Sequence, residues 1–217
     1  EKHLLTLPQV EIDNYKKKYN KIPKWDLPYK RTWIKKYSEK KEVKHWQIDD
    51  NILSINSVNK GKQVKTNPII ALQNIENFID RYSNIGISGL RHSVFANFQN
   101  KPFQLNQQVY SCVLVNNKTP YYWRNETIED TDFSLQNISG GYCTVLFNAF
   151  CFTKPTQMKM RGGNTDSAYS KTGAYMMAKQ LKKNWPMVVK NIIYKNGRPK
   201  VTINNVWSKY DTQLKRI

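Results

Sequence analysis

Three residues in the first fifth of the chain have the types and spacing of a metal-dependent nuclease site. Asp26, Glu42 and Lys44 imitate an acidic residue followed by Glu-x-Lys, which holds Mg²⁺ and positions an attacking water. In such a site an apolar strand leads into the glutamate, whereas here the preceding residues are Ser-Glu-Lys-Lys. A nuclease is therefore the runner-up hypothesis, and we assign no catalytic or metal-binding residue on this pattern.

Two further patterns suggest chemistry without completing it. Arg91-His92 is similar to the Arg-His pair of tyrosine recombinases, but the other residues of that family's site do not follow at its distances. Arg161-Gly-Gly lacks the strand, the helix and the Gly-Lys-Ser/Thr of a phosphate-binding loop. The remaining histidines, His3 and His45, are scattered. The sequence thus predicts no catalytic residue and no cofactor, and it favours a binding or structural role over an enzyme.

Positive charge is concentrated at the two ends of the chain. The net charge of +19 is distributed as +7 over residues 1–44, 0 over residues 45–153 and +12 over residues 154–217. Lysine and arginine displace the counterions condensed on phosphates, so we expect nucleic acid, single-stranded DNA or RNA, as the partner. A membrane surface is not expected, because the basic stretches lack the broad apolar face of an interfacial helix. The lysines that we expect to neutralise phosphates are Lys16, Lys17, Lys18, Lys35, Lys36, Lys40, Lys41, Lys179, Lys182 and Lys183.

The elements that must position these side chains divide the chain into two parts. Residues 1–41 are expected to form a basic, aromatic-rich N-terminal arm, with a short helix over 8–21 and an extended segment over 22–38. Residues 42–217 are expected to form a β-rich core domain with a basic C-terminal third. Within the core we predict strands over 43–48, 52–58, 105–116 and 142–153, helices over 69–82 and 169–185, an exposed loop over 125–137, and a hairpin over 188–203 that turns at Asn196-Gly197.

The three cysteines are expected to be buried free thiols. Cys112, Cys143 and Cys151 stand in apolar, strand-like contexts without a CxxC pair, and an odd count argues against a disulfide framework. Free thiols favour a reducing compartment.

One segment resembles a known family. Glu42-Val43-Lys44-His45-Trp46 follows a basic arm and precedes a Val-rich strand at 110–115, with Leu72, Ile75, Arg81 and Gly86 between them. This arrangement resembles the start of the jelly-roll capsid proteins of small circular single-stranded DNA viruses. The resemblance implies eight antiparallel strands in two sheets, a basic arm that faces the packaged genome, and self-assembly into a shell. The chain departs from that family by lacking an arginine-rich N-terminal arm and by its predicted helix over 69–82.

Charge and resemblance together predict a structural nucleic-acid-packaging protein. Its fold would be mainly β, an antiparallel β-sandwich (single jelly roll) with a few short helices. It would assemble into a large homo-oligomer, and its location would be the virion. A Mg²⁺-dependent nuclease or other nucleic-acid-processing enzyme is one alternative. A ribonucleoprotein or ribosomal component is another, since Lys, Asn, Ile and Tyr are abundant.

Overall fold

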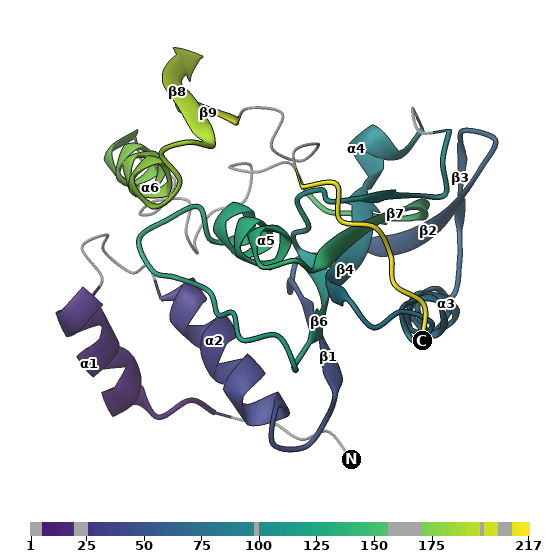
Figure 1. The fold of residues 1–217 in the computed structure, drawn as a ribbon, viewed down its shortest axis with the longest axis horizontal. Coiled ribbons are helices and arrows are strands. Elements are labelled where there is room, and N and C mark those ends of the chain that lie inside the picture. The colour runs from purple at the N-terminus through teal and green to yellow at the C-terminus, as the bar shows by residue number, and fades with distance from the viewer. Residues whose placement is uncertain (1–5, 20–25, 98–99, 156–170, 196–197, 204–209) are drawn as a thin grey trace.

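The computed structural model describes residues 6–19, 26–97, 100–155, 171–195, 198–203 and 210–217, and these residues form a mixed α/β fold (Figure 1). Within them lie six helices, a seven-stranded sheet and a separate two-stranded hairpin. The helices are α1 (Gln9–Tyr19), α2 (Leu27–Ser38), α3 (Pro68–Ile79), α4 (Ser93–Ala96), α5 (Glu129–Ser139) and α6 (Lys171–Asn184). The strands are β1 (Lys44–Ile48), β2 (Ser54–Asn59), β3 (Lys62–Lys65), β4 (Ile85–His92), β5 (Phe103–Leu105), β6 (Cys112–Asn116), β7 (Cys143–Thr153), β8 (Val189–Lys195) and β9 (Arg198–Ile203).

The main sheet has the strand order β1-β6-β4-β7-β2-β3, and β5 also pairs with β7. β4 and β7 run parallel, and the other pairs are antiparallel. A jelly roll would instead have two antiparallel sheets packed face to face. The expected sheet-rich core with helices is therefore confirmed, whereas the single jelly roll is not: the described residues form one mixed sheet with helices on both faces.

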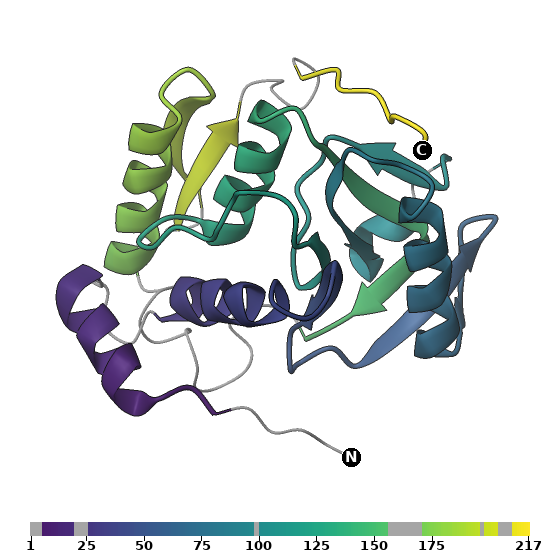
Figure 2. The ribbon, with the colours of Figure 1, turned by 60° about the horizontal axis from the view of Figure 1, so that its bottom comes forward.

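Helices cover both faces of the sheet, and this explains why residues 85–90 of β4 are all buried. On one face Ala71, Ile75 and Ile79 of α3 recur at the spacing of one helical stripe and belong to the same buried cluster as Leu90 and Leu114. On the other face Ile87, Val113 and Val115 pack against Trp123 and against Phe133 of α5. Figure 2 shows α3 and α5 on opposite sides of the sheet. Burial on both faces removes the polar alternation that marks a half-exposed strand.

Interactions between residues that are close in the sequence explain where several elements begin or turn. Asn67 begins α3, because its side-chain oxygen accepts a hydrogen bond from the Ile69 amide at 2.9 Å. Lys60 and Gly61 have positive φ angles of 48° and 74°, which suits the tight turn between β2 and β3. The predicted helices over 8–21 and 169–185 correspond to α1 and α6, and the hairpin over 188–203 to β8 and β9. Its turn at Asn196-Gly197 lies outside the described residues, as do His3 and Arg161-Gly-Gly.

Two expectations were wrong. The segment over 22–38, expected to be extended, contains α2, and Pro28 lies in the first turn of that helix, where a missing N–H costs no hydrogen bond. The segment over 125–137, expected to be an exposed loop, contains most of α5. The acidic residues of α5 lie in its first turn, where negative charge interacts favourably with the helix dipole.

The predicted strand over 105–116 is shorter than expected. Only Cys112–Asn116 forms β6, because the chain turns sharply before it. Asn106 and Ser111 have φ angles of 55° and 65°, which are incompatible with continuous extended structure. The interruption places the Ser111 side chain at one edge of the sheet, where its hydroxyl accepts a hydrogen bond from Lys154 Nζ.

Three helices from the two basic ends of the chain lie on the same side of the molecule (Figures 1 and 2). Met177 of α6 packs against Leu27 of α2 and against Ile128, just before α5. Both views show α1, α2 and α6 gathered on the side away from α3 (Figures 1 and 2). The lysines of these three helices, which are far apart in the sequence, therefore lie on one side, whereas residues 210–217 run along the side of α3 (Figure 1). Among the described helices, none is long and apolar enough to span a bilayer.

The cysteine prediction is confirmed. Cys112, Cys143 and Cys151 are free and buried. Burial raises the pKa of the Cys112 thiol to about 12 and the pKa values of Cys143 and Cys151 to about 11. These thiols are therefore poor nucleophiles near neutral pH, and they serve as small apolar side chains of the core.

Candidate functional site

Three strands of the sheet end at the same edge. Because β6 is antiparallel to both β1 and β4, and β4 is parallel to β7, the strands β1, β4 and β7 share one direction. They end at Ile48, His92 and Thr153. In open α/β sheets, ligands bind beyond the carboxyl ends of parallel strands. A binding or catalytic site is therefore expected at this edge of the sheet.

Five polar side chains meet at this edge, and we call Arg31, Asp49, Ser111, Asp130 and Lys154 the edge cluster. The Arg31 guanidinium lies between two carboxylates, 3.1 Å from Asp49 Oδ1 and 3.4 Å from Asp130 Oδ1. Lys154 Nζ lies 3.5 Å from Asp49 Oδ2 and donates a hydrogen bond of 2.6 Å to Ser111 Oγ. The cluster thus links α2, α5 and the ends of β1, β6 and β7.

Backbone hydrogen bonds fix the cluster at the sheet edge. Asp49 follows β1 directly, and its amide donates to the Ser111 carbonyl at 2.8 Å. Gln47 on β1 donates from Nε2 to the Arg31 carbonyl at 3.0 Å, which holds α2 against the strand. Lys154 follows β7 directly, and the preceding Thr153 carbonyl accepts a bond from the Leu53 amide. The side chains therefore stand on rigid elements, as a reactive site requires.

Exposure differs within the edge cluster. The side chain of Arg31 is 6% exposed and that of Asp130 is 16% exposed, whereas Asp49 and Lys154 reach 27% and 22%. Asp49 and Lys154 can therefore meet a ligand, while Arg31 lies behind them and holds the carboxylates in place.

Burial favours the protonated carboxyl at the start of α5. It raises the pKa of Glu129 to about 8, with a further contribution from the nearby Asp130 charge. Burial also raises the pKa of Asp130, and the Arg31 guanidinium opposes that effect. Near neutral pH the Glu129 carboxyl therefore retains a proton.

His92 and Arg91 end β4 beside the cluster. Arg91 is held by two neutral amides, since Nε donates to Asn148 Oδ1 and Nη2 donates to Gln104 Oε1, each at 2.5 Å. The His92 ring lies 5.2 Å from the Phe152 ring, and burial, together with the Lys154 charge, lowers the pKa of His92. His92 Nε2 is buried without a hydrogen-bond partner among the described residues. The recombinase-like pair is thus a structural arginine next to a neutral histidine.

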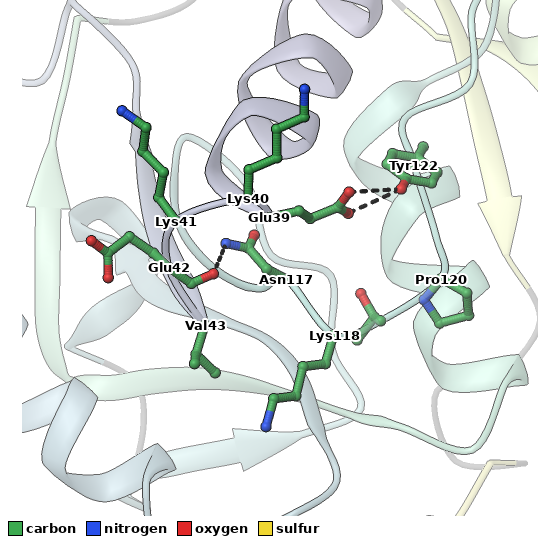
Figure 3. A pocket seen from close by; sticks show the side chains of 10 residues that line it. Glu39, Lys40, Lys41, Glu42, Val43, Asn117, Lys118, Pro120 and Tyr122 are labelled. Carbon is green, nitrogen blue, oxygen red and sulfur yellow. Dashed lines mark hydrogen bonds between the residues drawn. The ribbon is translucent and has the colours of Figure 1, made fainter.

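A surface pocket of about 590 Å³ lies at the opposite end of β1, and we call it the lysine pocket (Figure 3). The Glu39 carboxylate within it accepts hydrogen bonds from Tyr122 Oη at 3.0 Å and from Lys35 Nζ at 2.5 Å. Asn117 Nδ2 donates to the Glu42 carbonyl at 2.8 Å and closes one wall. The lining residues are Glu39, Lys40, Lys41, Glu42, Val43, Asn117, Lys118, Thr119, Pro120 and Tyr122.

Lys35 does not support its predicted role in phosphate binding. Its side chain is completely buried, and Nζ donates to the Thr119 carbonyl at 2.8 Å as well as to Glu39. Burial lowers the pKa of Lys35, and the hydrogen bond and charge of Glu39 oppose that effect. Lys35 is therefore a buried structural cation, and we remove it from the predicted set.

The other predicted lysines are distributed over three helices on one side of the molecule. Lys17 and Lys18 of α1 are exposed, and Lys16 lies 3.5 Å from Asp26. Exposed lysines on and beyond the other two helices are Lys36, Lys40, Lys41, Lys179, Lys182 and Lys183. Whether they bind phosphate remains a prediction.

The nuclease-like triplet does not form a site. Asp26 lies 3.2 Å from Lys30, and Lys44 lies 2.6 Å from Asp80. Glu42 instead lines the lysine pocket. In the part of the chain that the structure describes, no three His, Cys, Asp or Glu side chains are grouped as metal ligands.

The residues of the edge cluster were missed from the sequence. Asp49 and Lys154 each follow a correctly predicted strand directly, and that position was the available signal. This position could not be used without knowing the strand directions, because the expected antiparallel sandwich does not fix whether these two strands end at the same edge of a sheet. Arg31 and Asp130 were missed because their helices were not predicted.

Comparison with known proteins supplies the family. Residues 1–163 of the 217 match the family model described as TET-Associated Glycosyltransferase. The matched region contains the whole edge cluster and the lysine pocket, and it ends before α6. No curated protein and no solved structure matches the chain.

This match corrects the functional reading of the sequence. The resemblance to jelly-roll capsid proteins was wrong, since the matching family is one of glycosyltransferases and no capsid family matches. The packaging role, the expectation of a non-enzyme, and the nuclease and ribonucleoprotein alternatives were wrong for the same reason. The packaging role rested largely on charge, which favours a polyanionic partner but does not distinguish a shell protein from an enzyme. Because the match spans 163 of its 217 residues, the chain belongs to the TET-Associated Glycosyltransferase family.

Proposed function

We propose that this chain transfers a sugar from a phosphate-activated donor to a hydroxyl group carried by a nucleic acid, with the edge cluster as its catalytic centre. One observation carries the assignment. At the shared carboxyl edge of β1, β4 and β7, an accessible carboxylate, Asp49, lies beside an accessible cation, Lys154, and a buried arginine fixes the carboxylate. Glycosyl transfer needs a base for the acceptor and a cation for the leaving phosphate.

In the proposed reaction Asp49 takes the proton of the acceptor hydroxyl. The hydroxyl oxygen then forms a bond to the anomeric carbon of the donor. The bond between that carbon and the donor's phosphate oxygen breaks, and its electron pair leaves with the phosphate. Lys154 lies 3.5 Å from Asp49 Oδ2 and stabilises the negative charge on the departing group. Arg31 holds Asp49 Oδ1 at 3.1 Å and orients the carboxylate.

Asp49 is a better base than its neighbours. Glu129 retains its proton near neutral pH, because burial raises its pKa to about 8. Asp130 is less exposed than Asp49 and lies behind the guanidinium. His92 is neutral, but its Nε2 atom is buried. A base must come within hydrogen-bond reach of the acceptor hydroxyl, and among these groups Asp49 is the most accessible.

The charge of the chain supports a nucleic acid as the acceptor. The excess of Lys and Arg, +19 overall, lies at the ends of the sequence, and the structure gathers α1, α2 and α6 on one side. α2 also carries Arg31 of the edge cluster. Phosphates that contact this side would place a strand next to the proposed catalytic centre.

The test is transfer of a labelled sugar to three oligonucleotide acceptors: one with a hydroxymethylated base, one of RNA and one of unmodified DNA. We expect transfer by the parent to at least one acceptor, and a loss on the order of 10²- to 10⁴-fold in kcat for Asp49→Asn. Asp50→Asn is the matched control, because it makes the same change at the adjacent exposed residue.

The control should stay within about twofold of the parent, since substitutions of exposed side chains usually have small effects. Circular dichroism would verify that Asp49→Asn is folded. Absence of transfer to every acceptor would overturn the nucleic-acid assignment. Full activity of folded Asp49→Asn would overturn the assignment of the base.

A further inference from the structure

We propose that the lysine pocket is a second binding site for the acceptor strand, which it holds by the phosphates at a fixed distance from the reacting hydroxyl. The proposal rests on the proposed function of the edge cluster and adds a surface to it. The match to a family of transferases does not locate an acceptor site.

The pocket and the edge cluster lie at the two ends of the same pair of elements. α2 contributes Arg31 to the edge cluster, and Glu39, the residue after its last turn, lies at the pocket. Eight residues at 1.5 Å per residue separate the two by about 12 Å. β1 connects the same two places in the opposite direction. Val43, just before β1, lines the pocket, and Asp49, just after it, belongs to the edge cluster. Along β1, the six residues from Val43 to Asp49 cover about 20 Å at ~3.3 Å per residue. At ~3.4 Å per stacked nucleotide, a separation of about 12–20 Å corresponds to roughly four to six nucleotides.

The accessible charge of the pocket is positive. Lys40, Lys41 and Lys118 are exposed, and Figure 3 shows their ammonium groups extending outward from the pocket. The Glu39 carboxylate is already compensated by Lys35 and bonded to Tyr122. The pocket lining thus includes three exposed cations and one exposed carboxylate, Glu42. Such a surface attracts phosphate and repels a cationic partner.

Aromatic rings lie among these lysines. Tyr37 stacks on Trp33 with ring centroids 5.6 Å apart, and Lys41 Nζ lies 4.7 Å from the Tyr37 centroid. At the pocket, Lys36 Nζ lies 5.5 Å from the Tyr122 centroid. Surfaces that bind single strands combine lysines for the phosphates with rings on which bases stack. The combination favours a nucleic acid over a small phosphate ester.

The pocket is built on buried polar groups rather than on a loop alone. Asn117 and Thr119 are buried, and Lys35 Nζ donates to the Thr119 carbonyl at 2.8 Å. Asn117 Oδ1 also lies 2.7 Å from His45 Nδ1 on β1. Residues 117–119 are thereby fixed to α2 and β1 before any ligand arrives. Preorganisation of this kind lowers the cost of binding.

The binding test compares two triple variants made in the Asp49→Asn background, in which the strand can bind without turnover. The first, Lys40→Ala/Lys41→Ala/Lys118→Ala, removes the exposed charge of the pocket. The second, Lys60→Ala/Lys62→Ala/Lys65→Ala, removes the same charge from the β2–β3 hairpin at the other side of the sheet. Binding of a fluorescent single-stranded 16-mer is followed by anisotropy between 50 and 300 mM NaCl.

For the pocket variant we expect the slope of log K against log salt to fall by about 2, since each lost contact to a single strand contributes about 0.7. At 0.1 M salt this corresponds to binding weaker by on the order of 100-fold. The hairpin variant should retain the slope of its Asp49→Asn background. Equal slopes for the two triple variants would overturn the proposal.

A second measurement separates this proposal from the proposed reaction. With Asp49 intact, kcat/KM is measured for acceptors of three and sixteen nucleotides, and the pocket substitutions should abolish the advantage of the longer one. An increase in the donor KM with unchanged strand binding would identify a donor site instead and overturn the proposal. Failure of transfer with every acceptor would refute the proposed reaction, whereas the anisotropy result would still decide the role of the pocket.

Discussion

Replacement of Glu129 by glutamine should change how the stability of the protein depends on pH. Glu129 is 7% exposed in the first turn of α5, and burial raises its pKa from 4.5 to about 8. The folded state therefore binds a proton that the unfolded state has released. Such a group contributes stability that is complete below about pH 4.5 and is lost as the pH rises toward 8.

The magnitude follows from the two pKa values. Between pH 5 and pH 7 the unfolded carboxyl is mostly ionised and the folded one is mostly protonated, so the parent should lose about 2.5 kcal/mol of its free energy of unfolding to this group. Glutamine retains the shape and hydrogen-bonding capacity of the protonated acid but cannot ionise. Relative to the parent, Glu129→Gln should therefore gain about 2.5 kcal/mol between pH 5 and pH 7.

Urea unfolding at pH 5, 6 and 7 measures this difference, because the midpoint and slope give the free energy of unfolding at each pH. Glu42→Gln is the control, since Glu42 is an exposed carboxylate. Its curve should run parallel to that of the parent. If the Glu129→Gln curve also runs parallel to that of the parent, the carboxyl is ionised in the folded state, and the account of the charges around Arg31 fails.

Three further predictions concern the elements that support the two sites. Lys35→Ala should destabilise the protein by about 3–5 kcal/mol in urea unfolding, because it leaves the half-buried Glu39 without its cation and the Thr119 carbonyl without its donor; a loss below 1 kcal/mol would show that water replaces the ammonium group. Ile75→Ala should cost about 2–5 kcal/mol, since this fully buried side chain of α3 would leave a cavity against the sheet, and a thermal midpoint equal to that of the parent would contradict the packing. Asn67→Ala should cost about 1 kcal/mol by removing the cap of α3, whereas Asn67→Asp should retain most of that stability, and equal losses for both would refute the capping role.

Local chemistry explains which elements could be predicted from the sequence. Asn67-Pro68 marks the start of α3 because one side chain caps the helix and the next residue has a helical φ. The turn at Lys60-Gly61 and the alternation of the flanking strands are likewise decided within a few residues. These interactions involve only residues that are close in the sequence and do not depend on the rest of the fold, so the elements that they predict are found in the structure.

α5 could not be predicted because its polar residues acquire partners only in the folded protein. Asp132 is completely buried, and it accepts hydrogen bonds from Arg124, from Gln136 and from Trp185 Nε1 at 2.7 Å. Trp185 follows α6 and is more than fifty positions away in the sequence. An acidic, polar segment indicates an exposed loop unless these partners are known, and no periodicity reveals them.

The candidate site was missed for a related reason. Strand direction decides whether Asp49 and Lys154 lie together or at opposite ends of the sheet, and direction is a property of the whole topology. The parallel pairing of β4 with β7 brings both residues to one edge. Charge counts, in contrast, are independent of topology, and they predict a polyanionic partner without locating either site.

Burial determines which cations of the basic N-terminal segment can contact a ligand. Arg31 and Lys35 lie one turn apart on α2, so both face the sheet, and both are buried. Arg31 fixes the carboxylates of the edge cluster, and Lys35 fixes the wall of the lysine pocket. A charge count treats these two cations as available for phosphate, although each is already compensated within the protein. The exposed lysines that follow them, Lys36, Lys40 and Lys41, can contact a ligand. In the proposed arrangement, the same helix would therefore set the distance between the acceptor strand and the reacting group.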